Sequence, residues 1–143
     1  MTENYPCDLP AGTYDAIDPV VREPWLTALE SGTFGQTRGT LRFGRNYCCL
    51  GVLCEVALEL NHSDELPLGG DHTATIEKGL DTLEVITTEN GVRTYSRSAT
   101  LPEKMFGLSD AARRALMGMN DDLHLTFPEI AAAIRATKQE PTT

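Results

Sequence analysis

Long hydrophobic runs are missing from this sequence of 143 residues. No apolar stretch approaches the roughly 20 residues that an α-helix needs to cross a bilayer. The first residues also lack a basic segment followed by an apolar one, which a secretory signal would show. We therefore expect no membrane partner and no export, and we predict a cytoplasmic protein.

Positive charge is scarce as well. Twelve Lys and Arg residues stand against 21 Asp and Glu residues, which leaves a net charge of −9. Phosphates repel such a chain, so we expect no nucleic-acid partner. A protein that imitates DNA would also be acidic, but it would array its carboxylates in dense rows. Here the tightest cluster is Asp121-Asp122, and the scattered carboxylates indicate an ordinary solvated surface.

The sequence has four cysteines and no Cys-x-x-Cys pair. Cys7 stands alone, while Cys48, Cys49 and Cys54 belong to an octapeptide at 47–54, Tyr-Cys-Cys-Leu-Gly-Val-Leu-Cys. This spacing does not suit a zinc site, so we expect no bound metal, and we expect no other cofactor. Because the neighbours are apolar, the pattern favours reduced thiols that fill the core over reactive thiolates.

Apolar periodicity and capping signals predict one folded domain with irregular ends. We expect an irregular N-terminal arm over 1–17, a single globular domain over 18–136 and a flexible tail over 137–143. Apolar stripes that follow Ser, Thr, Asp or Pro predict the helices. They are expected at 20–31 (with a kink or restart at Pro24), at 49–60, at 110–118 and from Phe127 to the tail.

The clearest strand signal is at 82–99, where two β-rich runs flank Asn90-Gly91. This dipeptide suits a two-residue hairpin turn. Counting back from the turn gives an apolar pair and an opposite-charge pair, which support the register. The predicted pairs are Ile86 with Tyr95, Glu84 with Arg97, and Thr87 with Thr94.

Shorter segments complete the expected α+β fold class, with about four helices around a small antiparallel sheet. A second, short hairpin is predicted at 40–48. The polar stretches 61–78 and 120–122 are predicted to be loops. Gly51 lies inside a predicted helix, which it would weaken by about 1 kcal/mol relative to alanine. We therefore expect another backbone segment to pack closely against it.

A set of spaced motifs runs through two segments of the chain. The first contains Trp25-x-x-Ala28-Leu29-x-Ser31-Gly32, Gln36, Gly39, Leu41 and the octapeptide, and the second contains Leu101-Pro102, Gly107-Leu108, Asn120-Asp121 and Phe127-x-x-Ile130-Ala131-x-x-Ile134. These motifs resemble a family of small uncharacterised proteins of tailed bacteriophages, closely over 25–60 and loosely over 101–134. Where that family often has a tryptophan before Gly-Leu, this chain has Met105-Phe106. The resemblance implies a phage origin, hence the cytoplasm of an infected bacterium, and no known activity.

One functional interpretation is a cysteine hydrolase of the papain-like or NlpC-like kind. Cys49, or Cys48, would be the nucleophile at a helix N-terminus, where the helix dipole favours a thiolate. Gln36 would donate to the oxyanion, and His124 or His72 would be the general base. The apolar neighbours of the thiols argue against this arrangement, so the balance leans away from an enzyme.

A binding protein is the interpretation we favour. Arg38, Arg42 and Arg45 lie around glycines beside a helix start, and they are suitable donors for a phosphate-bearing small molecule. Gln36 would add a hydrogen bond, and Tyr47 would add a face for stacking. Arginines that only solvate a hairpin would give the same pattern.

A third interpretation makes the hairpin at 82–99 an exposed edge that adds a strand to a partner or to a second copy, which would form a homo-oligomer. From these alternatives we predict a small phage accessory protein that acts by binding. Its partner would be a host protein or a phosphate-bearing small molecule. Binding would counter a host defence factor or sequester a nucleotide signal.

Overall fold

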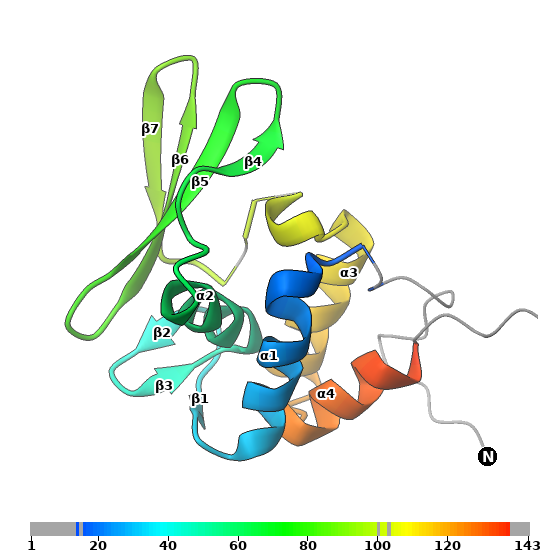
Figure 1. Ribbon diagram of the computed structural model, residues 1–143. Coiled ribbons are helices and arrows are strands. Elements are labelled where there is room, and N and C mark those ends of the chain that lie inside the picture. Colours follow the sequence, from blue (N-terminus) through cyan, green and yellow to red (C-terminus); the bar gives the residue numbers. More distant parts are fainter. Residues whose placement is uncertain (1–13, 15, 100, 103, 138–143) are drawn as a thin grey trace, which may run out of the picture.

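The helix that contains most of the octapeptide is the most buried element of the structure. The computed structural model describes residues 14, 16–99, 101–102 and 104–137. Helix α2 (Cys49–Glu59) has every residue from Cys49 to Ala57 buried, as its nearly continuous apolar sequence predicts. Figure 1 shows α2 between the strands and the other helices. No helix in the described ranges is both long and apolar enough to traverse a membrane.

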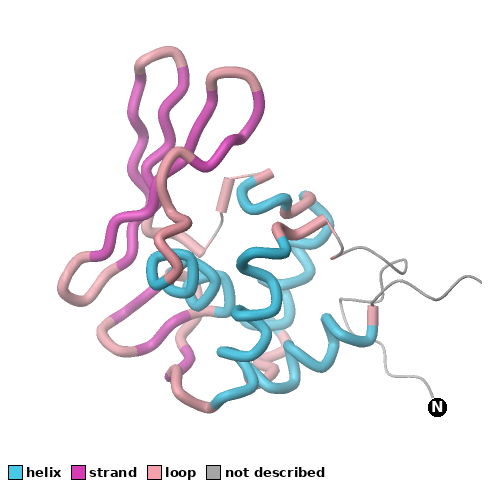
Figure 2. The backbone as a smooth tube through the Cα atoms, viewed as in Figure 1, coloured by secondary structure: helices cyan, strands magenta, loops and turns pink. Residues whose placement is uncertain are grey.

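The other α-helices lie where the sequence predicts them. They are α1 (Pro19–Ser31), α3 (Asp110–Met117) and α4 (Phe127–Ala136), with a short 3-10 turn η1 (Met105–Gly107) and a π-helix η2 (Gly118–Asp122). The loop predicted at 120–122 is therefore wrong, because the chain continues from α3 directly into η2. Figure 2 shows the helices gathered into one body, from which the longer strands project.

Capping side chains define where these helices begin. The Oδ1 atom of Asp18 accepts a hydrogen bond of 3.0 Å from the Val20 amide, and so starts α1. Thr126 and Glu129 form the predicted capping box of α4. Helix α1 runs through Pro24 as one element and ends before Gly32, whose φ of 77° is the left-handed conformation that favours glycine.

Two small sheets give the α+β architecture. The first has the order β1-β3-β2 and contains β1 (Gly35–Gln36), β2 (Arg42–Phe43) and β3 (Asn46–Tyr47). The second is antiparallel in the order β4-β5-β6-β7 and contains β4 (Leu66–Gly69), β5 (His72–Lys78), β6 (Leu83–Glu89) and β7 (Val92–Ser96). Strand β3 pairs parallel with β1 and antiparallel with β2, which confirms the short hairpin.

The hairpin of β6 and β7 has the predicted register. Ile86 pairs with Tyr95 and Thr87 pairs with Thr94 around the Asn90-Gly91 turn. The predicted charge pair also forms, since Arg97 Nε lies 3.6 Å from Glu84 Oε2. Strand β7 is an edge strand of its sheet, with most of its residues exposed.

The loop predicted at 61–78 is wrong, because this segment supplies β4 and β5. Leu66 and Leu68 alternate with exposed residues, and across the turn Ala74 and Ile76 alternate with half-buried threonines. Each strand has only two such buried positions, which is too short an alternation to stand out in a polar sequence. Pairing with β6 decides their structure.

Gly51 packs as the sequence predicts. A Cβ atom added to it would lie 1.8 Å from the carbonyl oxygen of Leu41. The backbone just before β2 therefore crosses directly over α2, and it is held there by a 3.2 Å hydrogen bond from the Cys48 amide to the same oxygen.

The predicted arm and tail fall largely outside the described residues. Of the arm, Tyr14, Ala16 and Ile17 are described; Tyr14 and Ile17 are buried in the core, and Ala16 is exposed. Of the tail, Thr137 is described and caps the end of α4.

Candidate functional site

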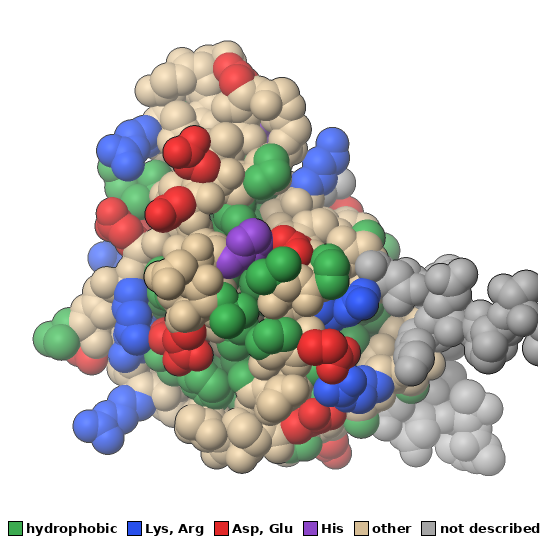
Figure 3. Space-filling model, in the orientation of Figure 1, with side chains coloured by type: hydrophobic (Ala, Val, Ile, Leu, Met, Phe, Trp, Pro, Cys, Tyr) green, Lys and Arg blue, Asp and Glu red, His purple; other side chains and the backbone are tan. Residues whose placement is uncertain are grey.

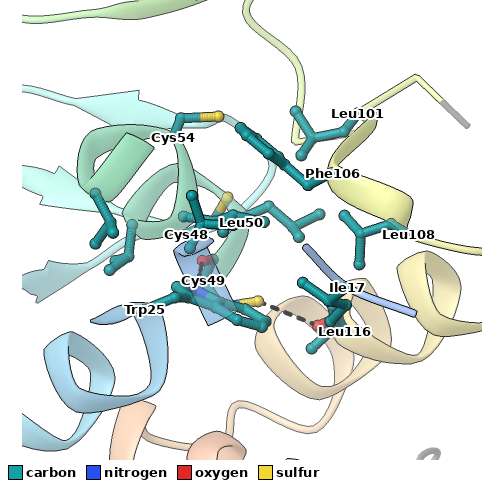
Figure 4. Packing of buried hydrophobic residues seen from close by; sticks show 14 of the residues in the cluster. Ile17, Trp25, Cys48, Cys49, Leu50, Cys54, Leu101, Phe106, Leu108 and Leu116 are labelled. Carbon is teal, nitrogen blue, oxygen red and sulfur yellow. Dashed lines mark hydrogen bonds between the residues drawn. The ribbon is translucent and has the colours of Figure 1, made fainter. Parts of the chain in front are cut away.

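The three described cysteines lie inside the protein. Cys48, Cys49 and Cys54 expose 2%, 1% and 0% of their surface, and all three are free thiols. The Cys48 sulfur accepts a hydrogen bond from the Gly51 amide and caps α2. The Cys49 thiol donates to the carbonyl oxygen of Leu116 at 3.6 Å, as Figure 4 shows. Their surroundings are the aliphatic and aromatic side chains of the core.

Burial keeps these thiols protonated. It raises the pKa of Cys48 to about 11, and it raises the pKa values of Cys49 and Cys54 well above the ordinary range. The helix dipole at the start of α2 does not offset the loss of water around the sulfur. At neutral pH none of the three supplies the thiolate that a cysteine hydrolase requires.

The other residues of the hydrolase interpretation do not complete a catalytic site. His124 is exposed, and His72 lies in β5. Among the described residues, neither histidine forms a hydrogen bond or ion pair with Cys49. Gln36 donates its side-chain amide to the Asn120 Oδ1 atom at 2.9 Å and to the Leu125 carbonyl at 2.8 Å, so its donor group is already occupied.

Asn120 organises this region, and the sequence reasoning missed it by placing it in a loop. Its side chain is 1% exposed and makes four hydrogen bonds. The oxygen accepts from Gln36 and from the Cys49 amide, and the nitrogen donates to the Thr37 carbonyl and to Asp121. Every polar atom of the amide is thus satisfied, and Asn120 joins β1, the start of α2 and η2.

The predicted ligand-binding residues separate into two groups. Gln36, Tyr47 and Arg42 are direct neighbours across the three strands of the first sheet. Arg38 and Arg45 are exposed, and within the described part of the chain neither forms an ion pair. The sheet therefore positions the first group, while the second remains available at the surface.

Tyr47 is part of the core rather than a free stacking face. Its hydroxyl donates to Glu55 Oε1 at 3.2 Å, and its ring packs perpendicular to that of Phe34 with 5.1 Å between centroids. The guanidinium carbon of Arg42 lies 5.3 Å from the Tyr47 centroid. Burial, and then the charge of Glu55, raise the pKa of Tyr47. The phenol therefore stays neutral.

Glu55 is a carboxylate that the fold buries and then neutralises. It is 5% exposed, and its Oε2 atom lies 2.9 Å from the half-exposed ammonium of Lys78 on β5. This pair ties α2 to the four-stranded sheet. A buried carboxylate without such partners would be strongly destabilising.

Two neighbouring turns form an exposed patch. Leu80 and Phe43 are 90% and 72% exposed, the highest values among the large hydrophobic side chains of the described residues. Phe43 ends β2 just before the turn that contains Gly44, and this turn is bonded to the turn that contains Leu80, since the Gly44 amide donates to the Asp81 carbonyl at 3.1 Å. Arg45 is exposed in the same turn as Gly44. We call Phe43, Arg45 and Leu80 the tip patch.

The arginine of β2 stiffens the tip patch from beneath. Arg42 donates to the Gly44 carbonyl at 2.7 Å and to the Gly79 carbonyl at 3.4 Å, so it bridges the two turns. Figure 3 shows a hydrophobic projection at the left edge, where Figure 1 places these turns, with both acidic and basic side chains near it. The sequence reasoning selected the arginines but missed both hydrophobic residues, because only the fold brings them together.

Comparison with known proteins identifies the family of this chain. A family described as "Domain of unknown function (DUF8296)" matches residues 17–138. The chain belongs to this family. No curated protein and no solved structure matches the sequence of this chain. Among the described residues of this family member, no group of three or more His, Cys, Asp or Glu side chains is placed to hold a metal ion.

Proposed function

We propose that this protein acts by binding a host protein through the tip patch, as an accessory protein of a tailed bacteriophage in the cytoplasm of the infected cell. The observation that carries the proposal is the position of Phe43 and Leu80. Single exposed hydrophobic residues are common on proteins, but here the two most exposed large ones among the described residues lie at two adjoining turns. Such groups are typical of contact sites.

The composition and rigidity of the tip patch suit a protein partner. Aromatic and arginine side chains dominate the binding energy of protein interfaces. The hydrogen bonds of Arg42 and Gly44 hold both turns in place before binding, which lowers the entropy lost on association. Arg45 places positive charge beside the apolar groups of a protein whose net charge is −9. A partner with an acidic rim around an apolar pocket would be complementary.

The biological outcome that we propose is inhibition of a host defence factor. The thiols supply no nucleophile, so occupation of a partner's surface is the action that the geometry supports. A second candidate function is the binding of a nucleotide signal through its phosphates. It is favoured by Arg38 and Arg45, because both guanidinium groups are exposed and form no ion pair within the described residues.

Affinity capture with matched variants tests the proposal. Immobilised protein is incubated with bacterial lysate, and retained proteins are identified by mass spectrometry. The double substitution Phe43→Ser with Leu80→Ser should reduce the capture of a specific partner at least tenfold, since truncating an interface anchor costs about 2 kcal/mol or more. Leu123→Ser, at another exposed leucine, is the control and should retain the partner.

The outcomes separate the candidate functions. Equal capture by the double variant and the wild type would contradict the tip patch as the contact. If the protein instead binds labelled cyclic nucleotides and releases them intact on heating, and Arg38→Ala with Arg45→Ala abolishes that binding, the nucleotide candidate replaces the host-protein proposal.

A further inference from the structure

A separate pocket lies where the four-stranded sheet joins the helical body. It has a volume of about 480 Å³ and is formed by the residues that lead into α1, the segment between α2 and β4, and η1. Ligand pockets commonly have volumes of about 300–1,000 Å³ and combine apolar walls with a few polar groups. Leu66, Pro67 and Phe106 supply the apolar walls here. None of its lining residues belongs to the tip patch.

The pocket wall is held by unusual backbone conformations. Glu65, Lys104 and Phe106 have φ values of 49°, 74° and 58°, although none of them is glycine. The left-handed conformation costs about 1–2 kcal/mol for such residues. Gly107 is required at the same wall, because an added Cβ would lie 2.1 Å from the Ala16 carbonyl oxygen. Strained residues are typical of ligand sites, where the surrounding structure holds them.

A histidine and an aspartate pair inside the pocket. His62 Nε2 lies 2.7 Å from Asp18 Oδ2, while the other carboxylate oxygen of Asp18 caps α1. This contact fixes the orientation of the imidazole. Its second nitrogen, Nδ1, forms no hydrogen bond with a described residue. Figure 3 shows histidine, acidic and hydrophobic side chains meeting at this junction.

The other charged residues of the pocket wall are two carboxylates near the start of β4 and one ammonium group near its end. Asp64 and Glu65 are exposed, come just before β4, and form no ion pair with another described residue. The Lys104 ammonium lies near the opposite end of β4, where it would be 3.7 Å from a Cβ atom added to Gly69. The end of the pocket beside His62 therefore has two unneutralised carboxylates, and the positive charge is at the far end.

From this arrangement we propose that the pocket binds an organic cation, a primary ammonium or guanidinium group on an aliphatic stem. The cation would lie at Asp64 and Glu65, and His62 would accept a hydrogen bond from it through Nδ1. The stem would pack on Leu66, Pro67 and Phe106. A free polyamine and a lysine or arginine side chain of a peptide share this chemistry. The acidic net charge of the protein would favour the approach of either.

Nuclear magnetic resonance titration with two probes tests this site. Spermidine represents the free polyamine, and an acetylated, amidated tripeptide with a central arginine represents the peptide source; inorganic phosphate is the anionic control. The wild type in about 150 mM salt, which limits nonspecific attraction, should show saturable shifts centred on the His62 ring and on Ala16 and Leu66. Saturation by spermidine alone identifies a polyamine site, and tighter saturation by the peptide identifies a side-chain site.

Variants then distinguish the pocket from general attraction to an acidic protein. Asp64→Asn with Glu65→Gln should weaken binding at least tenfold. Glu77→Gln, at an exposed carboxylate on β5 outside the pocket, should leave it unchanged. The proposal is overturned if the chemical shift changes spread evenly over the acidic surface, or if neither cation shifts the resonances of the His62 ring. It is also overturned if phosphate shifts those resonances instead, or if the pocket double variant and the Glu77→Gln control bind the cations equally well. The wild-type titration stands even where a variant folds poorly.

Discussion

Replacing Gly51 by alanine tests how closely the chain packs at the centre of the molecule. The new Cβ would lie 1.8 Å from the Leu41 carbonyl oxygen and 2.8 Å from its carbon, whereas ordinary contacts begin near 3.4 Å. The backbone before β2 and helix α2 would have to separate by roughly 1.5 Å in a core that is otherwise close-packed. That movement would also stretch the hydrogen bond from the Cys48 amide to Leu41.

The magnitude follows from opposing contributions. Alanine favours a helix over glycine by about 1 kcal/mol. Overpacking costs about 1–3 kcal/mol, and a weakened buried hydrogen bond costs about 1 kcal/mol more. We therefore expect Gly51→Ala to lower the free energy of unfolding by about 2–3 kcal/mol, because the rigid backbone places the overpacking near its upper limit.

Equilibrium unfolding in urea, followed by circular dichroism, measures this change. With a slope of about 1–3 kcal/mol/M for a protein of this size, the midpoint should fall by about 0.7–3 M. Gly91→Ala is the control, since its φ is 78° but nothing lies within 4 Å of an added Cβ. It should lose only the strain energy of about 1–2 kcal/mol. A Gly51→Ala protein more stable than the wild type would refute the close approach.

Three further predictions concern the buried polar groups and thiols. Asn120→Ala should lower the free energy of unfolding by about 2–3 kcal/mol, because it leaves the Cys49 amide and other buried groups unpaired; a loss below about 0.5 kcal/mol in urea unfolding would contradict its central role. Iodoacetamide at neutral pH should leave Cys48, Cys49 and Cys54 unmodified until urea is added, as peptide mass spectrometry can determine. Rapid labelling of any of them in the native protein would contradict their burial and support the hydrolase interpretation. Partial burial raises the pKa of Asp18, but hydrogen bonds from the Val20 amide and His62 outweigh this effect and leave the pKa below its ordinary value. The stability that the Asp18 carboxylate contributes should therefore be present near neutral pH and be lost as the pH falls below the ordinary value of 3.8. The difference in unfolding free energy between the wild type and Asp18→Asn should therefore shrink in acid, and a difference that grows there would contradict this assignment.

The elements that the sequence predicts correctly are those with local signals. The capping box at Thr126 and Glu129, the Asn90-Gly91 turn and the apolar surface of 49–57 each act within a few residues, so they are visible without knowledge of the fold. Strands β4 and β5 have no such signal, because their partners lie across a turn and in β6. Their pairing is a tertiary effect that no local pattern in 61–78 reveals.

The features of the candidate site that the sequence predicted are likewise those with local signals. The sequence indicated that the thiols are buried, because apolar neighbours surround them along the chain. It also selected Arg45 as an exposed donor. It did not predict the tip patch, because Phe43 and Leu80 are far apart in sequence and only hydrogen bonds between the adjoining turns bring their segments together. Nor did it predict the pocket, to which Asp18 and His62 come from segments far apart in the sequence.

The sequence by itself determined where the four α-helices lie, where the main hairpin turns and that the cysteine-rich octapeptide belongs to the core. Backbone preferences and burial of apolar side chains are expressed over a few neighbouring residues, so these features are visible locally. Only the tertiary structure decided that Asn120 joins three elements, that a lysine neutralises Glu55 and that a pocket opens beside His62. Those features depend on polar groups from distant segments, and such groups find their partners only when the packed core brings them within hydrogen-bonding distance.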